Sequence, residues 1–253
     1  GVQTCALPIS VKVGIIGAGG IAVTMARTLN QMEDATAYAV ASRSLEKAET
    51  FAKEHQVEKA YGSYEEMLQD PEVELVYVAT PHSHHYECMK LALCYGKPVL
   101  CEKAFTVNAE QAEEILSISE EKKLFVGEAM WTRFLPSRKM IDEVVSSGEI
   151  GQVHMITANL GYDIRMVERL RNPALAGGAL LDVGIYPLTF IRMITSAKIT
   201  SINTSCVKLE TGVDAQNTVT FIFEDGCMAT MHSSILGGTE QAGIVYGDKG
   251  YLI

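Results

Sequence analysis

The fold of this chain is decided by residues 11–29, which read VKVGIIGAGGIAVTMARTL. The first six, 11–16, are mostly apolar and run directly into glycine, which predicts a short strand buried on both faces. Apolar residues at Ile21, Met25 and Leu29 then repeat at helical spacing. A strand, a glycine turn and a helix in this order predict a βαβ unit that binds a dinucleotide.

The turn in this unit has the pattern GxGxxA, from Gly17 to Ala22. Gly17 permits the tight turn, Gly19 lets the backbone approach a pyrophosphate, and the small Ala22 lets the helix pack on the strand. The helix terminus that follows offers unpaired N–H groups and a partial positive charge to the anion. The alternative is a glycine-rich turn with a structural role alone. The predicted cofactor-binding residues here are Gly17, Gly19, Gly20 and Ile21.

The end of the second predicted strand, 35–41, carries a basic residue where many dinucleotide-binding chains carry an acid. An Asp or Glu at this position binds the ribose 2′-hydroxyl of NAD, and this chain has neither residue there. Arg43, with the Ser42 hydroxyl and with Lys47 one turn later, would instead hold a 2′-phosphate. We therefore expect NADP(H) in preference to NAD(H), with a solvated surface arginine as the alternative.

Strands and helices alternate as far as residue 130, and Ser44, Ser63 and Asn108 are predicted to cap three of the helices. The alternation predicts right-handed crossovers and a parallel, doubly wound Rossmann sheet in an α/β fold. Longer alternating runs follow, and Asp225-Gly226 between two of them is a hairpin signal. These runs predict an α+β domain with a largely antiparallel open sheet. The expected organisation is a leader at 1–10, a Rossmann domain at 11–130 and a substrate and dimerisation domain at 131–253.

Both ends depart from this pattern. Residues 1–10 carry no charge and no initiator Met, and they resemble a cloning or adapter translation more than a targeting signal. The other end stops at Ile253, inside a predicted strand that follows a glycine turn. We expect a chain truncated at both ends, with the second domain incomplete.

Composition narrows the possible partners and the compartment. The 253 residues include 21 Lys plus Arg against 31 Asp plus Glu, a net charge of −10, which argues against nucleic acid and anionic membranes as partners. Apolar runs are shorter than the roughly 18 residues of a spanning helix. The six cysteines are sparse and form no CxxC pair, which is typical of reduced core cysteines. We expect a cytoplasmic protein.

Three polar clusters fall where a nicotinamide would lie, since open α/β sheets bind ligands at the carboxyl ends of their strands. Thr80 to His85 follow one predicted strand, Glu102-Lys103 follow the next, and Gly177 to Tyr186 lie in the second half. Three histidines in four residues raise the possibility of a metal. However, positions i, i+2 and i+3 on a loop converge poorly on one ion, and no Asp, Glu or Cys joins them, so we expect no metal.

With these motifs the chain resembles the glucose–fructose oxidoreductase / inositol dehydrogenase (GFO/IDH/MocA) family, over Val11 to Ile253. The segments Glu128 to Phe134 and Thr211 to Asp214 resemble the branch that holds dimeric dihydrodiol dehydrogenases and NADP-dependent D-xylose dehydrogenases. The resemblance implies a Rossmann domain, an open second sheet, a homodimer or higher homo-oligomer, and hydride transfer with a nicotinamide cofactor.

The family's three motifs occur here with one departure each. The EKP motif is Glu102-Lys103-Ala104, and the alanine is expected to relax the local backbone. In the ATPNxxH stretch, His82 replaces Asn while His85 takes the histidine position. In DxGxH, Tyr186 replaces His, which disfavours an inositol dehydrogenase. The further cofactor-binding residues implied are Thr80, Pro81, His82, His85, Glu102 and Lys103; for His85, substrate contact and helix-end structure both remain open.

The residue types also fit oxidation of a secondary alcohol without the family. A tyrosine with its ordinary pKa of about 10 is a poor base at neutral pH unless a cation stabilises the phenolate. On this interpretation Lys103 is that cation, Tyr186 is the general acid/base, and Asp182 orients Lys103 or the substrate. Trp131 and Arg133 are candidate substrate residues, although Trp131 is equally suited to packing between domains.

The sequence therefore predicts an NADP-dependent oxidoreductase that acts on a hydroxyl of a cyclic polyol, an aldose or a trans-dihydrodiol. One rival is a dinucleotide-binding sensor that kept the fold and lost the chemistry, although such a binder needs neither Lys103 nor Tyr186. Another is a reductase of an anhydro-sugar or an imine. No motif decides among these substrates, because substrate choice rests on cleft side chains.

Overall fold

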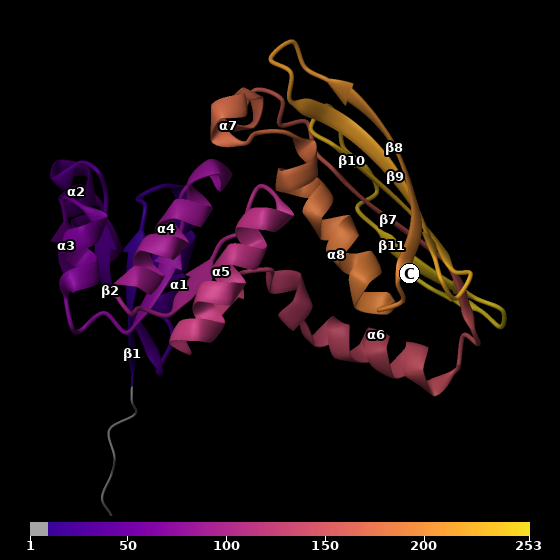
Figure 1. The fold of residues 1–253 in the computed structure, drawn as a ribbon, viewed down its shortest axis with the longest axis horizontal. Helices are drawn as coiled ribbons and strands as arrows, with labels where there is room; N and C mark the ends of the chain where they lie inside the picture. Colours follow the sequence, from indigo (N-terminus) through magenta and orange to yellow (C-terminus); the bar gives the residue numbers. More distant parts are fainter. Residues whose placement is uncertain (1–9) are drawn as a thin grey trace, which may run out of the picture. The chain divides into compact units, whose positions relative to one another are not determined.

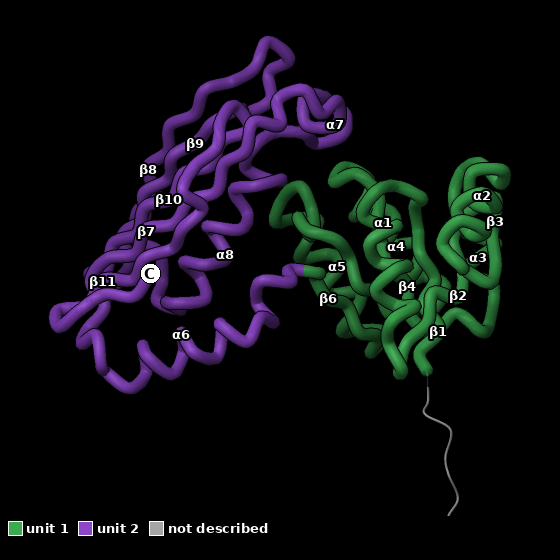
Figure 2. Tube along the Cα trace, turned by 180° about the vertical axis from the view of Figure 1, so that it is seen from behind, with its two compact units in different colours: residues 1–129 green, residues 130–253 purple. Residues whose placement is uncertain are grey.

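The computed structural model of the chain describes residues 10–253, so the predicted leader at 1–10 lies outside the described residues except for Ser10. The chain divides into two compact units, residues 1–129 and 130–253, which Figure 2 shows in two colours. Each unit is built around its own six-stranded sheet.

Unit 1 is a doubly wound parallel sheet with helices packed against it, as the sequence predicts (Figure 1). Its strand order is β3-β2-β1-β4-β5-β6. The strands are β1 Val11–Ile16, β2 Ala35–Ala41, β3 Lys59–Tyr61, β4 Leu75–Val78, β5 Val99–Cys101 and β6 Val126–Glu128. The helices are α1 Gly20–Leu29, α2 Leu45–His55, α3 Tyr64–Gln69, α4 His82–Cys94 and α5 Ala109–Lys122. Ile15 and Ile16 are both fully buried and belong to different apolar clusters, which confirms that β1 is covered on both faces.

Three of these helices begin where polar side chains cap them, as the sequence indicates. The side chains of Ser44, Ser63 and Asn108 accept hydrogen bonds from the backbone N–H three residues later, at the starts of α2, α3 and α5. Helix α4 begins at His82, directly after Pro81. Pro81 fixes the chain in an extended conformation directly before the helix.

Unit 2 is a mostly antiparallel sheet with the order β12-β11-β7-β10-β9-β8, in which only the β7–β10 pair is parallel. Its strands are β7 Val153–Gly161, β8 Ile199–Lys208, β9 Asp214–Phe223, β10 Met228–Ser234, β11 Gly243–Gly247 and β12 Tyr251–Leu252. Its helical segments are η1 Trp131–Phe134, α6 Pro136–Ser147, α7 Glu168–Arg171, η2 Pro173–Leu175, the π-helical η3 Leu180–Gly184, and α8 Ile185–Ile194. The predicted hairpin joins β9 to β10, where Gly226 adopts a φ of 84°.

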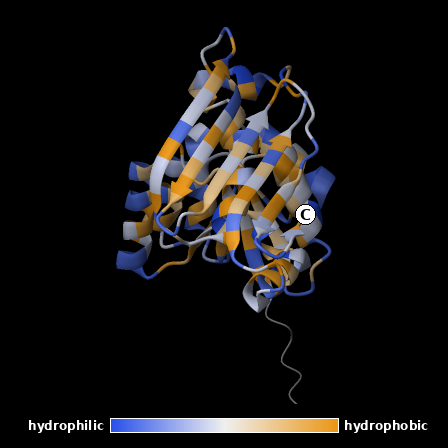
Figure 3. Ribbon diagram, turned by 90° about the vertical axis from the view of Figure 1, so that its right-hand side faces the viewer, coloured by the Kyte–Doolittle hydropathy of each residue, from blue (hydrophilic) through white to orange (hydrophobic). Residues whose placement is uncertain are grey.

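One face of this second sheet is packed and the other is not. Along β9 the buried residues alternate with exposed ones, and the buried set packs with α8 around Ile191 and Phe221. Strand partners directly opposite one another share a face. The uncovered face (Figure 3) therefore carries Met155, Thr157, Asn159, Ser201, Asn203, Ser205, Val207, Gln216, Thr218, Thr220, Ile222, Met228, Thr230, His232, Ser234, Ile244, Tyr246 and Tyr251. None of these residues is Asp, Glu, Lys or Arg.

Within the described residues, one stretch, Pro173–Ile194, is long and apolar enough to cross a membrane by length and composition alone. It is not one continuous helix, because Ala176 and Gly178 have positive φ values of 52° and 114°. Its second part, α8, buries Pro187, Thr189 and Ile191 within unit 2. We therefore interpret the stretch as a core helix with its preceding loop.

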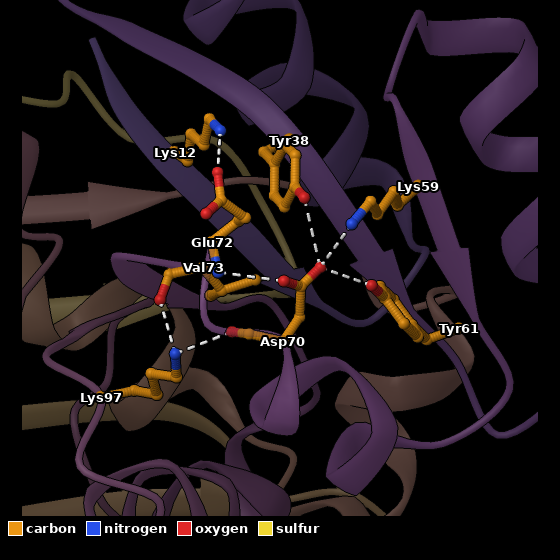
Figure 4. A network of polar contacts seen from close by, with 8 residues as sticks. All are labelled: Lys12, Tyr38, Lys59, Tyr61, Asp70, Glu72, Val73 and Lys97. Atoms are coloured by element: carbon orange, nitrogen blue, oxygen red, sulfur yellow. Dashed lines mark hydrogen bonds and ion pairs between the residues drawn. The ribbon is translucent and has the colours of Figure 1, made fainter. Parts of the chain in front are cut away.

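Strands β2 and β3 of unit 1 are tied together by the buried carboxylate of Asp70, which follows α3 (Figure 4). Its Oδ2 accepts hydrogen bonds from Tyr38 on β2 at 3.3 Å and from Lys59 and Tyr61 on β3 at 2.9 and 2.6 Å. The Lys97 ammonium, which precedes β5, donates to the Asp70 carbonyl oxygen at 2.8 Å. Burial opposes ionisation of Asp70, but the bonds from Tyr61 and Lys59 outweigh it and hold the pKa of the carboxyl well below its usual range.

We expect Asp70→Asn to destabilise the fold by about 2 kcal/mol, since it removes hydrogen bonds to a buried charge. The pKa of Asp70 is depressed in the folded state, so its contribution is complete above the ordinary carboxyl pKa of about 3.9 and is lost as the pH falls through the folded value. Urea unfolding at about pH 7 and about pH 3 measures both effects. Glu72→Gln, which removes an exposed partner of Lys12, is the control and should cost under about 0.5 kcal/mol. Equal losses in the two variants would contradict the assignment.

Candidate functional site

The carboxyl edge of the parallel sheet is level across five strands. Ala41, Ile16, Val78, Cys101 and Glu128 are paired in one row from β2 to β6. The backbone hydrogen bonds continue one residue beyond this row at each strand. The segments that follow these strands therefore start side by side, which is where open α/β sheets bind ligands.

The glycine turn after β1 leaves the amino end of α1 open. Gly17 has a φ of 102°, and a Cβ there would lie 2.9 Å from the Ala79 carbonyl oxygen, so only glycine fits. By contrast, a Cβ on Gly19 or Gly20 would meet no atom within 4 Å. Gly19 caps α1 in an extended conformation without a side-chain hydrogen bond. The turn thus presents the start of α1, including Ile21, to a ligand, which fits a pyrophosphate.

A pocket of about 490 Å³ lies beside this turn and runs between α1 and α2. Gly19, Ser44 and Lys47 line it, together with the acidic Glu46. Next to these residues Arg43 is exposed, while Ser42 is buried and its hydroxyl accepts the Ser44 N–H at 3.4 Å. Arg43 and Lys47 are thus the predicted 2′-phosphate residues that solvent reaches, whereas Ser42 shapes the turn.

The histidine cluster stands in the first turn of α4, not on the predicted loop. His82 and His85 are both buried, and their rings meet edge to face. The Nδ1 of His85 lies 2.7 Å from the Ala104 carbonyl oxygen and its Nε2 lies 2.9 Å from the Thr80 carbonyl oxygen. His85 therefore ties the segment after β4 to the segment after β5. Within the described part of the chain, no group of three metal-binding side chains occurs.

The turn that carries Lys103 is held by carboxylates on both sides. Glu102 accepts a hydrogen bond from the Tyr77 hydroxyl and another from the Lys103 N–H, the latter at 3.2 Å. Glu128 accepts the Phe105 N–H at 2.9 Å. The Lys103–Ala104 peptide bond is cis. With the His85 contact to Ala104, this turn is fixed at several points instead of being relaxed as the sequence led us to expect.

Sequence reasoning did not assign Tyr77 and Glu128 to this turn. Tyr77 is fully buried inside β4, and its position in an apolar strand predicts a core residue. Glu128 ends β6 in the same row as Cys101. Its position at the carboxyl end of a predicted strand is the sequence feature that could have assigned it to the site. Tyr77 is 25 residues away from Glu102, and Glu128 is 23 residues away from Phe105. Only the folded sheet brings the two members of each pair together.

In unit 2, the segment before Tyr186 contains two glycines that lie too close to neighbouring atoms to carry a side chain. A Cβ on Gly177 would lie 2.5 Å from the Leu170 carbonyl oxygen, and one on Gly178 would lie 2.0 Å from Oδ1 of Asp214. The other carboxylate oxygen of Asp214 accepts the Leu180 N–H at 2.6 Å. The glycine pair and Asp214 therefore place the start of η3, which leads directly into α8.

Asp182 and Tyr186 lie one turn apart at the junction of η3 and α8. Asp182 is buried, and its Oδ1 accepts a hydrogen bond from the Arg169 guanidinium at 3.0 Å. The Tyr186 hydroxyl oxygen lies 3.3 Å from Nε1 of Trp131, whose ring meets the tyrosine edge-on. The Arg169 side chain is about half exposed, and it reaches Asp182 across 13 residues.

The predicted site residues thus fall into two groups. Unit 1 holds the glycine turn, Arg43, the Thr80–His85 segment and the Lys103 turn. Unit 2 holds Trp131, Arg133, Asp182 and Tyr186. Trp131 and Arg133 are both exposed on η1. The association of Lys103 with Tyr186 or Asp182 stays a prediction.

A dinucleotide-binding sheet edge and a second unit with a mixed sheet define an oxidoreductase of the Rossmann class. The profile of the oxidoreductase family with an NAD-binding Rossmann fold matches residues 11–129, and the GFO/IDH/MocA C-terminal domain matches residues 139–253. The chain belongs to the GFO/IDH/MocA family of NAD(P)-dependent oxidoreductases that act on CH–OH groups.

Among curated proteins, the chain is similar to trans-1,2-dihydrobenzene-1,2-diol dehydrogenase from Bos taurus, with 39% identity over 241 residues, 94% of this chain and 72% of that protein. Among solved structures it is similar to GenD2 from gentamicin A biosynthesis in complex with NAD, with a TM-score of 0.89, 21% identity, and coverage of 97% and 72% of the two chains. It is also similar to KijD10, a 3-ketoreductase from Actinomadura kijaniata in complex with NADP, with a TM-score of 0.85, 24% identity, and coverage of 96% and 74%.

The contacts of His85 predict a pH-dependent stability. Burial lowers the pKa of its ring and outweighs the two carbonyl oxygens, which raise it. The contribution of the neutral ring is therefore complete above the unfolded pKa of about 6.5 and is lost as the pH falls through the lower folded value. In His85→Leu we expect about 1–2 kcal/mol less stability at about pH 8 and a flatter dependence below it.

Urea unfolding across this pH range measures the effect on stability. The matched control is His154→Gln, which changes an exposed histidine of unit 2 and should retain the wild-type slope. A wild-type slope in His85→Leu as well would show that the buried ring does not cause it.

Proposed function

We propose that this chain is an NADP-dependent oxidoreductase that transfers a hydride between the nicotinamide and a hydroxyl carbon of a cyclic polyol, an aldose or a trans-dihydrodiol. The relatives named as dihydrodiol dehydrogenases support this substrate class. The observation that carries the proposal is the set of hydrogen bonds that fixes the turn around Lys103. A lysine that is only a solvated loop residue would not need its backbone held in this way. Described cysteines that form no disulfide support a cytoplasmic location.

In the proposed reaction the chain's own residues handle the proton. The bound nicotinamide supplies the acceptor or donor of the hydride. During oxidation the Tyr186 phenolate takes the substrate hydroxyl proton and becomes a phenol, and during reduction it returns that proton. The Lys103 ammonium favours the phenolate by its charge. Asp182, whose buried carboxylate accepts a hydrogen bond from Arg169, orients Lys103 or the substrate.

We expect Tyr186→Phe to lower kcat by about 10²–10⁴-fold, because it removes the group that exchanges the proton. The Kd for NADPH, measured by its fluorescence, should stay within about twofold of wild type. The control is Tyr162→Phe, which removes an exposed hydroxyl in the same unit and should keep wild-type turnover. Comparable turnover in Tyr186→Phe and wild type would remove Tyr186 from the mechanism, and the rival sensor function predicts no turnover in any form.

The preference for NADP(H) rests on Arg43 and Lys47, which are exposed beside the glycine turn. We expect Arg43→Ala to raise the Kd for NADPH by about 10- to 100-fold, the value of a charge-assisted hydrogen bond, and to leave the Kd for NADH unchanged. Lys53→Ala, on the exposed side of α2, is the control. If Glu46 in the same pocket instead binds a ribose hydroxyl, wild type will prefer NADH and Arg43→Ala will affect both cofactors alike.

We further propose that the uncovered face of the second sheet forms a homodimer or a higher homo-oligomer. This face carries no formal charge, although 21% of the chain is charged. Exposed apolar side chains lie in one row across it, from Tyr251 through Met155 and Met228 to Ile222. An uncharged sheet surface that is crossed by a row of exposed apolar side chains is typical of an interface.

We expect Met228→Lys to shift the protein from oligomer to monomer in sedimentation velocity, since it buries a charge in the interface. Ile202→Lys is the matched control, because Ile202 is exposed on β8 but lies on the opposite face. A wild-type protein that is monomeric at micromolar concentration would exclude this assembly.

A further inference from the structure

The Tyr186 hydroxyl is contacted by a side chain to which the proposed mechanism gives no chemical role. Nε1 of Trp131 lies 3.3 Å from the Tyr186 oxygen, and the two ring centroids are 6.3 Å apart at 64°. The two residues are separated by 55 positions, so the contact depends on the packing of η1 against the start of α8. Both belong to unit 2.

An indole N–H is a hydrogen-bond donor and never an acceptor. When it donates to the Tyr186 oxygen, the hydrogen of the tyrosine hydroxyl must point away from Trp131, which leaves that hydrogen for another acceptor. A donor aimed at this oxygen also interacts more strongly with a phenolate than with a phenol, because the phenolate carries the charge. The contact therefore sets both the direction and the charge preference of the hydroxyl.

We propose that Trp131 is a positioning residue for proton transfer, whose indole N–H aims the Tyr186 hydroxyl and stabilises its phenolate. This role rests on the proposed function of Tyr186 as the general acid/base, and it differs from the role of an apolar wall for the substrate. An apolar wall needs the area of the ring, whereas the positioning role needs the N–H group.

The charged groups packed around this junction are few among the described residues of unit 2. Asp182 precedes Tyr186 by one turn and is paired with Arg169 on α7. Asp214 on β9 accepts the Leu180 N–H and the Asn217 amide. On the packed faces of β9 and β10, the residues next to η3 are the neutral Asn217 and Ser233.

The remaining titratable group on the packed face of β7 is His154, which stands at the opposite end of that strand. Arg133 shares η1 with Trp131, and Arg192 lies at the far end of α8, where it donates to the Ala197 carbonyl oxygen. In this unit the Asp182 charge is offset by its ion pair with Arg169, whereas the Trp131 N–H contacts the Tyr186 oxygen and favours the phenolate. Removal of the N–H should therefore move the ionisation of Tyr186 to higher pH.

The kinetic test compares Trp131→Phe with wild type in alcohol oxidation. Phenylalanine keeps an aromatic ring and removes the N–H, so the acid limb of the kcat profile should move to higher pH by about one unit, a tenfold lower kcat on that limb. Phe134→Leu is the matched control, because Phe134 is an exposed aromatic residue on the same helix. A change in KM with an unmoved kcat profile would leave only the apolar wall and would overturn the proposal.

A spectroscopic test needs neither substrate nor cofactor, because Trp131 is the single tryptophan of the chain. A tyrosinate quenches a neighbouring indole, so Trp131 emission in wild type should fall as Tyr186 ionises, at lower pH than the change that the other tyrosines cause. Tyr186→Phe should lack this first transition. Identical fluorescence titrations would overturn the contact, whereas full turnover in Tyr186→Phe would overturn the proposed function and leave the contact intact.

Discussion

The candidate site of unit 1 depends on one constraint, the common register of the parallel strands at their carboxyl ends. Gly17 donates its N–H to the Ala41 carbonyl oxygen, Ala79 donates to Ile16, and Glu102 donates to Val78. These bonds carry the ladder one residue beyond the paired row. Because every strand stops at this level, the glycine turn, the Thr80 segment and the Lys103 turn emerge next to one another, and a shift of one residue in any strand would separate them.

Side chains then hold the backbone of these segments. Glu102 and Glu128 accept hydrogen bonds from backbone N–H groups, and His85 contacts two backbone carbonyl oxygens. In unit 2, Asp214 accepts a backbone N–H at the start of η3. Such bonds satisfy backbone groups that a turn leaves unpaired. A ligand that binds at these turns meets a backbone that is already fixed, so less conformational entropy is lost on binding.

The elements that sequence reasoning found are those whose causes are local. The caps at Ser44, Ser63 and Asn108 act within three residues, and the glycine turn follows from the conformation that Gly17 must adopt. The three-residue strand β3 was not predicted, because it is too short to show a period and exists only as a partner of β2. The histidines were assigned to a loop because Pro81 marks a boundary without saying which side is helical.

By itself, the sequence determined the alternation of the longer strands and helices of unit 1, the dinucleotide-binding turn, the basic residue after β2 and the family, since each is recorded in residues that are close along the chain. Only the tertiary structure decided which partners the functional side chains have. Asp182 with Arg169, Trp131 with Tyr186, and Asp70 with Tyr38 join residues 13, 55 and 32 positions apart. No local pattern specifies such pairs, because they form only when packed elements bring the side chains within hydrogen-bond distance.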